Sequence, residues 1–152
     1  MLETLIPYKL ELADSLVRSM SKYHRGRIHE EKVMNRYRKY PRIRSARSLK
    51  VDVIIFSEKG VTKLVECKRC SQDSVYIYPR DLQTLHHYYE RLTKLGHRPQ
   101  MVLSLWFHKR KITREVILDP ALLERGEPIK FELRDGKIFR GTPKIRAQTT
   151  SP

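Results

Sequence analysis

The order of apolar and polar residues predicts helices in the first quarter of the chain. Apolar residues recur at helical spacing across residues 10–20, so we expect an amphipathic helix there. Gly26 should then interrupt or bend the helical segment. Residues 28–40 predict a second, strongly basic helix, which stops before Pro41 because the residue preceding a proline avoids the α conformation. Residues 42–50 have the pattern of a short strand followed by a loop.

Two runs of apolar, β-branched residues come next and predict a hairpin. Residues 51–56 and 61–68 form its strands. The Glu-Lys-Gly between them suits a three-residue loop, with Gly60 in the left-handed conformation that such loops use. Apolar side chains then repeat at helical spacing across residues 80–96, and Gly96 marks the end of this helix.

The last third of the chain predicts further strands and one short helix. The continuous apolar run at 100–107 is typical of a strand buried on both faces, so we expect helices to cover the sheet. Residues 111–118 predict another strand. Asp119 has the position of an N-cap before a short helix that begins with proline. Asp135 and Gly136 suit the two-residue turn of a final hairpin.

These elements predict one α/β domain with a mixed central sheet flanked by helices. The length of 152 residues is enough for a single domain to bury a core. We place the domain at residues 1–141, with residues 1–25 as an N-terminal helical extension. Residues 142–152 are polar and contain proline, so we expect them to form a disordered tail.

Apolar runs and cysteine content indicate an intracellular protein. No run approaches the roughly 20 apolar residues of a membrane span. Acidic residues stand near the N-terminus, where a signal peptide would have a basic start and an apolar core. With only two cysteines the chain has no disulfide framework, which favours a reducing compartment. We therefore expect a cytoplasmic protein with no membrane partner.

The two cysteines, Cys67 and Cys70, are spaced as a C-x-x-C pair. A structural zinc site needs about four ligands. The sequence has no second cysteine pair, so His86 and His87 would have to complete such a site. Strand alternation instead turns Cys67 to the face opposite its charged neighbours, where it would be buried.

The net charge of +15 is concentrated in one stretch. Residues 18–50 contain twelve Lys or Arg and only two Glu, with tyrosines between the charges. Arginine makes bidentate contacts to phosphate and aromatic rings can stack, so this stretch predicts a polyanionic partner. A solvated helix face is the alternative. The residues that we expect to bind nucleic acid are Arg25, Arg27, Lys32, Arg36, Arg38, Lys39, Arg42, Arg44, Arg47 and Lys50.

The predicted hairpin carries charges where apolar residues are expected. A three-residue loop places Asp52 directly opposite Glu66, and directly opposed residues have Cβ atoms about 4.5–5.5 Å apart. Two carboxylates at that distance repel each other, whereas a divalent cation between them reverses the sign of the interaction. Period-two alternation puts Lys68 on the same face as Glu66. An ammonium group there can orient a metal-bound water or hold a phosphate. A cross-strand salt bridge is the alternative reading.

The spacing of these charges resembles the Asp…Glu-x-Lys motif of the PD-(D/E)XK nuclease superfamily: Asp52 is followed, after thirteen residues, by Glu66-Cys67-Lys68. Three neighbouring segments extend the likeness: "GRIHEEKV" in the preceding helix, "RIRSARS" before the acidic strand, and "VYIYPRDLQTLHHYYERL" after it. This order is similar to that of archaeal Holliday-junction resolvases, and it covers residues 26–107. Val51 stands where the superfamily motif has proline.

The resemblance implies a restriction-endonuclease-like core and further site residues. Glu30 would be an additional acid near the metal, and the Cys67 carbonyl would complete the ligand shell. Ser45 and Ser48 would belong to a serine-bearing loop of the active site. Gln83 would be the polar residue that the following helix directs at the site.

We therefore expect a magnesium-dependent endonuclease that cuts DNA according to its structure, with Mn²⁺ able to replace Mg²⁺. The alternatives are a sequence-specific restriction-type enzyme and a catalytically idle DNA-binding protein of the same fold. The resemblance also implies a homodimer acting on branched DNA, and an archaeal or archaeal-virus source. Two symmetric cuts across a junction require two sites related by a two-fold axis.

Overall fold

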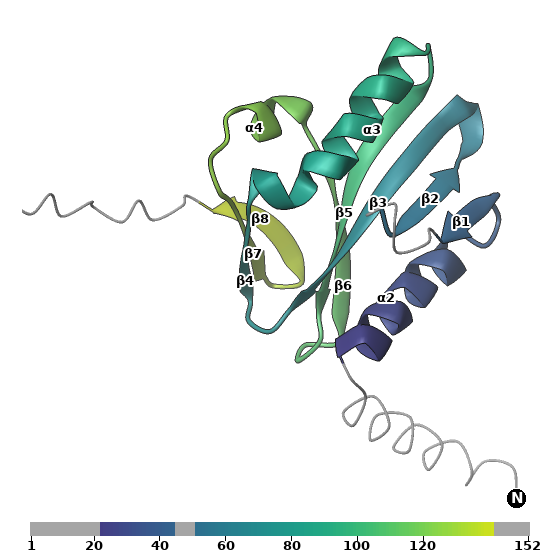
Figure 1. Ribbon diagram of the computed structural model, residues 1–152. Helices are drawn as coiled ribbons and strands as arrows, with labels where there is room; N and C mark the ends of the chain where they lie inside the picture. The colour runs from purple at the N-terminus through teal and green to yellow at the C-terminus, as the bar shows by residue number, and fades with distance from the viewer. Residues whose placement is uncertain (1–21, 45–50, 142–152) are drawn as a thin grey trace, which may run out of the picture.

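Alternating apolar residues build a five-stranded main sheet in the computed structural model of the protein, which describes residues 22–44 and 51–141 (Figure 1). Its strand order is β1-β2-β3-β5-β6. β3 and β5 are parallel and the other neighbouring pairs are antiparallel, so the predicted mixed sheet is confirmed. The strands are β1 (Arg42–Arg44), β2 (Val53–Phe56), β3 (Val61–Cys70), β5 (Arg98–Phe107) and β6 (Ile112–Leu118).

Helices cover both faces of this sheet, as predicted. α2 (Lys22–Arg36) buries Val33 against β2 and β3 on one face. On the other face, a 3-10 turn leads into α3 (Gln83–Lys94), which buries Leu85 in a larger core. Residues 101–107 of β5 are buried throughout, which confirms the prediction of a strand covered on both sides. None of the helices in the described ranges is long and apolar enough to cross a membrane.

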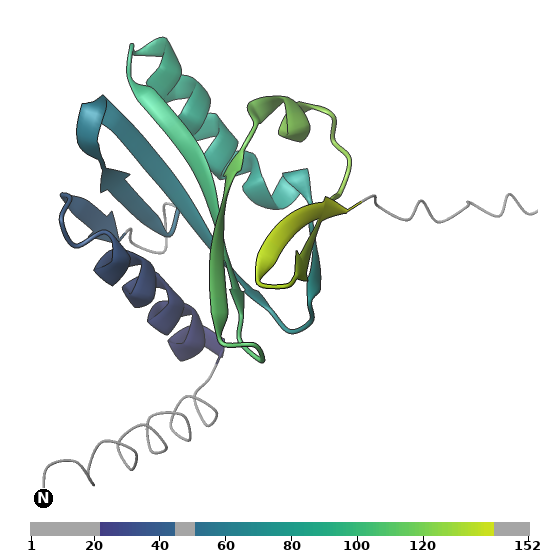
Figure 2. The ribbon, with the colours of Figure 1, turned by 180° about the vertical axis from the view of Figure 1, so that it is seen from behind.

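A second, three-stranded sheet packs beside β5 and α3 on the side away from α2 (Figures 1 and 2). Its strands are β4 (Ser74–Ile77), β7 (Ile129–Arg134) and β8 (Lys137–Gly141). β4 was not predicted from the sequence. A four-residue strand is recognised by its partner, and β4 pairs with the distant β7. α4 (Pro120–Glu124) connects β6 to this sheet.

The basic helix differs from its prediction at both ends. α2 continues through Gly26 without interruption and ends at Arg36 instead of Tyr40. Glycine inside a helix costs about 1 kcal/mol relative to alanine, which the packing of the apolar face of α2 can offset. After Arg36 the chain turns, and the Arg42 guanidinium donates to the carbonyls of Arg38 and Tyr40 at 3.1 and 3.3 Å. These bonds satisfy two carbonyls in the turn that follows the end of α2.

The predicted turns and caps are confirmed. Gly60 and Gly136 have φ of 70° and 71°, as their hairpin loops require. Asp119 caps α4 by accepting a 3.0 Å hydrogen bond from the Ala121 N–H. The predicted helix at 10–20 and the tail at 142–152 lie outside the described residues.

Candidate active site

Asp52 lies where the pairing of β2 with β3 ends. The register of the hairpin is the predicted one and runs to the pair Val53–Val65. One residue earlier, the Asp52 N–H donates to the Val65 carbonyl at 3.1 Å. The Asp52 carboxylate accepts a 2.7 Å hydrogen bond from the Cys67 N–H, so a side chain supplies the acceptor that a longer β2 would have provided.

Glu66 and Lys68 project from the same face of β3. Leu64 and Cys70 lie on this same face of the strand, and they pack in the core beneath α3. The Lys68 Nζ lies 3.2 Å from the Glu66 Oε1, and both side chains are largely shielded from solvent. The structure thus brings together the acid and the lysine of the predicted motif.

The electrostatics of this region oppose the charged form of Glu66. Burial first, and then the neighbouring Asp52 carboxylate, raise the pKa of Glu66 to about 7, although Lys68 acts in the other direction. The pKa of Asp52 is also raised by burial, against the lowering effects of the Cys67 N–H and of Lys68. Two carboxylates held this way have a strong affinity for positive charge, because one lysine does not compensate for both.

Glu30 approaches the same region from α2. Its pKa is raised by burial and by Asp52, while Arg44 opposes the shift. The Arg44 Nε lies 4.0 Å from the Glu30 Oε2. Glu30 also contributes to the raised pKa of Glu66. Three carboxylates from three different segments therefore interact electrostatically.

The backbone of Cys67 faces Asp52, while its thiol packs beneath α2, within electrostatic reach of Asp52, Glu30 and Glu66. In an antiparallel pair the N–H and C=O of one residue face the same neighbouring strand. Since the Cys67 N–H faces Asp52, its carbonyl oxygen is directed to the same side. The Cys67 thiol packs in the core beneath α2 and Cys70 in the core beneath α3, so the two thiols cannot share a zinc ion. Burial raises the pKa of both thiols, that of Cys70 to about 11.

Other predicted site residues are placed less directly. Gln83 is the first residue of α3 and is exposed. Within the described ranges, no hydrogen bond or ion pair joins it to Asp52, Glu66 or Lys68. Ser45, Ser48, Arg47 and Lys50 lie outside those ranges, and Arg25 lies in α2.

The predicted phosphate-binding residues divide into paired and unpaired groups. Arg27, Arg36 and Arg44 form ion pairs of 3.4–3.6 Å with Glu31 or Glu115. The Lys32 ammonium lies 4.5 Å from the centre of the Trp106 ring. By contrast, Arg38 and Lys39 are exposed and, in the described part of the chain, form no ion pair. The sequence could not reveal the pairings with Glu115 and Trp106, because these two residues are distant along the chain.

Sequence reasoning also missed a second group of metal-binding residue types. His86 and Glu90 on α3 meet Glu124 on α4, with their ligand atoms within 4.8 Å of one another. The His86 Nε2 lies 3.5 Å from the Glu90 Oε1. The i, i+4 spacing of the first two residues is a signal in the sequence, whereas the contribution of α4 requires the fold. This group is separate from Asp52 and Glu66.

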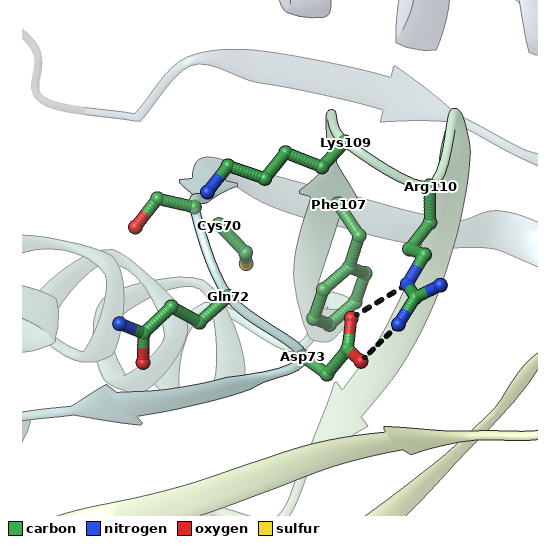
Figure 3. Close-up of a pocket in the computed structure, with 7 residues that line it drawn as sticks. Cys70, Gln72, Asp73, Phe107, Lys109 and Arg110 are labelled. Atoms are coloured by element: carbon green, nitrogen blue, oxygen red, sulfur yellow. Dashed lines mark hydrogen bonds and ion pairs between the residues drawn. The ribbon is translucent and has the colours of Figure 1, made fainter.

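Among the described residues, two of the larger cavities lie outside the acidic site. One of about 300 Å³ separates the loop after β3 from the turn after β5, where Asp73 holds the Arg110 guanidinium by hydrogen bonds of 3.1 and 2.9 Å (Figure 3). Another of about 340 Å³ is lined mainly by apolar residues of β2, β3 and α3. Neither lining includes Asp52, Glu66 or Lys68.

Fold and site together define a mixed α/β protein with interacting carboxylates and a lysine at the point where two strands stop pairing. The chain matches no known family model and no curated protein. Among solved structures it is similar to Hjc, a Holliday junction resolvase from the archaeal hyperthermophile Archaeoglobus fulgidus. The match covers 76% of this chain and 82% of that one, with 17% identity and a TM-score of 0.46.

Proposed function

We propose that the protein is a metal-dependent endonuclease that hydrolyses phosphodiester bonds of branched DNA. The observation that carries this proposal is the pair of half-buried carboxylates, Asp52 and Glu66, with the Lys68 ammonium 3.2 Å from Glu66. A salt bridge for stability alone needs one acid and one base. The second acid, and the third in Glu30, add repulsion that a bound cation would relieve.

The donor set fits magnesium, which takes oxygen ligands from a few protein groups and keeps water and phosphate as the others. Asp52, Glu66, the Cys67 carbonyl and Glu30 are the groups that would hold it. When bound, Mg²⁺ or Mn²⁺ supplies an activated water and charge compensation at the phosphate.

Lys68 has a separate task at this site. Its ammonium lies at the edge of the acidic cluster and is partly exposed, so it can donate to the attacking water or to a phosphate oxygen. Glu66 holds this ammonium in place. Positioning a nucleophile in line with the bond that breaks is the main contribution a protein makes to phosphoryl transfer.

The basic stretch favours recognition of DNA by shape. Arg38 and Lys39 are free to contact phosphate, whereas residues 18–50 contain only one amide side chain, Asn35, for reading adenine edges. A protein that grips the backbone without reading bases selects DNA by the arrangement of its strands. We infer from this a preference for junctions, and a homodimer that makes paired cuts. An intracellular setting agrees with the two free cysteines.

The test is cleavage of four-way junction, flap, nicked and linear duplex DNA, each in two unrelated sequences, with Mg²⁺ or Mn²⁺. The proposal expects paired cuts near the branch point in both sequences, and none with the Asp52→Asn variant. Cleavage of linear duplex at one recurrent sequence would instead assign a restriction-type enzyme. Binding without cleavage in either metal would assign an idle DNA-binding protein. Sedimentation of the free protein tests the dimer.

A further inference from the structure

The outer face of the β4-β7-β8 sheet exposes two aromatic rings. The inner residues of these strands, such as Ile77 and Phe131, are buried in the core beneath α3. The alternate residues point outward, and among them Tyr76 on β4 is 38% exposed and Phe139 on β8 is 42% exposed. Both rings stand on the outer strands, on either side of β7.

Cations lie beside both rings. The Lys130 Nζ is 5.7 Å from the centre of the Tyr76 ring, and the Arg134 Cζ is 4.5 Å from the centre of the Phe139 ring. Glu132 stands between these cations on β7 and binds both, at 2.8 Å from Lys130 and 3.6 Å from Arg134. One carboxylate therefore fixes two cations against two rings.

The Lys130 side chain lies over Gly141, where the absence of a side chain leaves room for it. The two residues are paired in the register of β7 and β8. A Cβ at position 141 would lie 2.9 Å from the Lys130 Cδ, which is closer than such atoms approach. The arrangement of ring and cation at this edge thus depends on a residue without a side chain.

The charge of this face suits a polyanion. Its outward residues include three cations, Lys130, Arg134 and Lys137, and one carboxylate, Glu132, which is already paired. Beyond the end of β4, Tyr78 is also exposed, and the Arg80 guanidinium lies 5.1 Å from its ring. The face lies on the opposite side of the molecule from α2, so it is a surface distinct from the basic stretch (Figures 1 and 2).

We propose that this face binds an unpaired DNA strand, with bases stacked on Tyr76 and Phe139 and a phosphate held by Lys137, the one of the three cations that Glu132 does not pair. Exposed aromatic rings with adjacent cations are the combination that single-stranded nucleic acid requires, because stacking needs a free base face. Bases in a duplex are stacked on one another and cannot use these rings. An apolar protein surface would need contiguous apolar area, whereas here charged side chains of β7 separate the rings.

The test measures binding of a fluorescent oligothymidine of about 15 nucleotides, within the range of known single-strand site sizes. EDTA is present throughout, so the result does not depend on cleavage. Stacking is worth about 1–3 kcal/mol per base, so Tyr76→Leu and Phe139→Leu should each weaken binding at least about fivefold. Leucine keeps apolar area at each position and removes only the aromatic face.

Phe56→Leu is the matched control, because Phe56 is 44% exposed on β2, outside this face. It should leave oligothymidine binding unchanged. The ring variants should keep wild-type melting temperatures, duplex affinity and metal-dependent cleavage, so that loss of this binding is distinct from failure of the active site. Wild-type affinity of both ring variants for oligothymidine would overturn the proposal. Tighter binding of oligouridine than of oligothymidine would assign the face to RNA and overturn it as well.

Discussion

The carboxylate of Asp52 accepts a 2.7 Å hydrogen bond from the backbone N–H of Cys67, across the point where β2 stops pairing with β3. This bond ties the position of one acid to the backbone of the strand that carries Glu66. The distance between the two carboxylates is therefore set by main-chain geometry and not by flexible side chains alone. It also means that Asp52 has a structural task in addition to its proposed role at a metal.

Asp52→Asn and Asp52→Ala should separate these two tasks. The amide oxygen of asparagine can still accept from Cys67, so Asp52→Asn should keep its stability and lose cleavage by at least about 100-fold. Asp52→Ala leaves a buried N–H unpaired and should in addition lose about 1–3 kcal/mol of unfolding free energy. Both should bind DNA as tightly as the wild type or more tightly, because repulsion toward phosphate is reduced. A wild-type cleavage rate in either variant would show that the site is misassigned.

Glu66→Gln should stabilise the metal-free protein at alkaline pH. The pKa of Glu66 is raised from 4.5 to about 7 in the fold. A raised carboxyl pKa adds stability that is full below the unfolded value and is lost as pH rises through the folded value. At about pH 8 the variant should gain about 1–3 kcal/mol over the wild type, and near pH 4.5 the difference should vanish. Urea unfolding in EDTA at the two pH values measures these stability differences. A variant less stable than the wild type at the higher pH would contradict the raised pKa of Glu66.

His29 should make the protein sensitive to acid. Burial, and then Lys32, lower the pKa of His29 from 6.5 to about 4, and its Nε2 lies 3.0 Å from the Ser104 Oγ. A lowered histidine pKa gives stability that is full above pH 6.5 and is lost as pH falls toward 4. His29→Asn should flatten this loss, which amounts to a few kcal/mol.

The measurement for His29 is urea unfolding between these pH values in the Glu66→Gln background. That background is needed because Glu66 titrates in the same pH range and changes the stability in the opposite direction. An unchanged slope after His29→Asn would show that the imidazole is charged in the folded protein.

Arg38 and Lys39 should carry more of the salt dependence of DNA binding than the paired arginines. Each phosphate contact contributes about −0.9 to the slope of log affinity against log salt concentration. Replacing both residues with glutamine should therefore flatten the slope by up to about 1.8. Arg27→Gln with Arg36→Gln is the matched control and should change it less, because Glu31 and Glu115 already engage those side chains. Equal changes of the slope in the two double variants would contradict the distinction between ion-paired and unpaired cations.

The parts of the fold that were predicted correctly are those set by local chemistry. The register of the β2–β3 hairpin follows from loop length and from period-two alternation, and both can be read from consecutive residues. The N-cap at Asp119 and the turn at Asp135 depend on one or two side chains. β4 was missed because its partner strand is distant in sequence, and the path of α2 through Gly26 because packing overrides propensity.

In the candidate site, too, the features set by neighbouring residues could be predicted and those set by packing could not. Asp52, Glu66 and Lys68 lie on one hairpin, so their proximity follows from its register. The approach of Glu30 depends on how α2 packs, and only the resemblance indicated it. The hydrogen bond from Cys67 to Asp52 was not foreseen, because it forms where the strand ladder ends and regular pairing rules no longer apply.

The origin of Glu30 on α2 has a consequence for the newly synthesised chain. The apolar face of α2 must pack, with Val33 against the sheet and His29 beside Ser104, before Glu30 can join the other two acids. The β2–β3 hairpin, with Asp52 at its end, brings together only two of the three acids. The cluster is therefore complete only once the helix has docked on the sheet, and a variant that weakens this docking should lose the third acid while the other two stay in place.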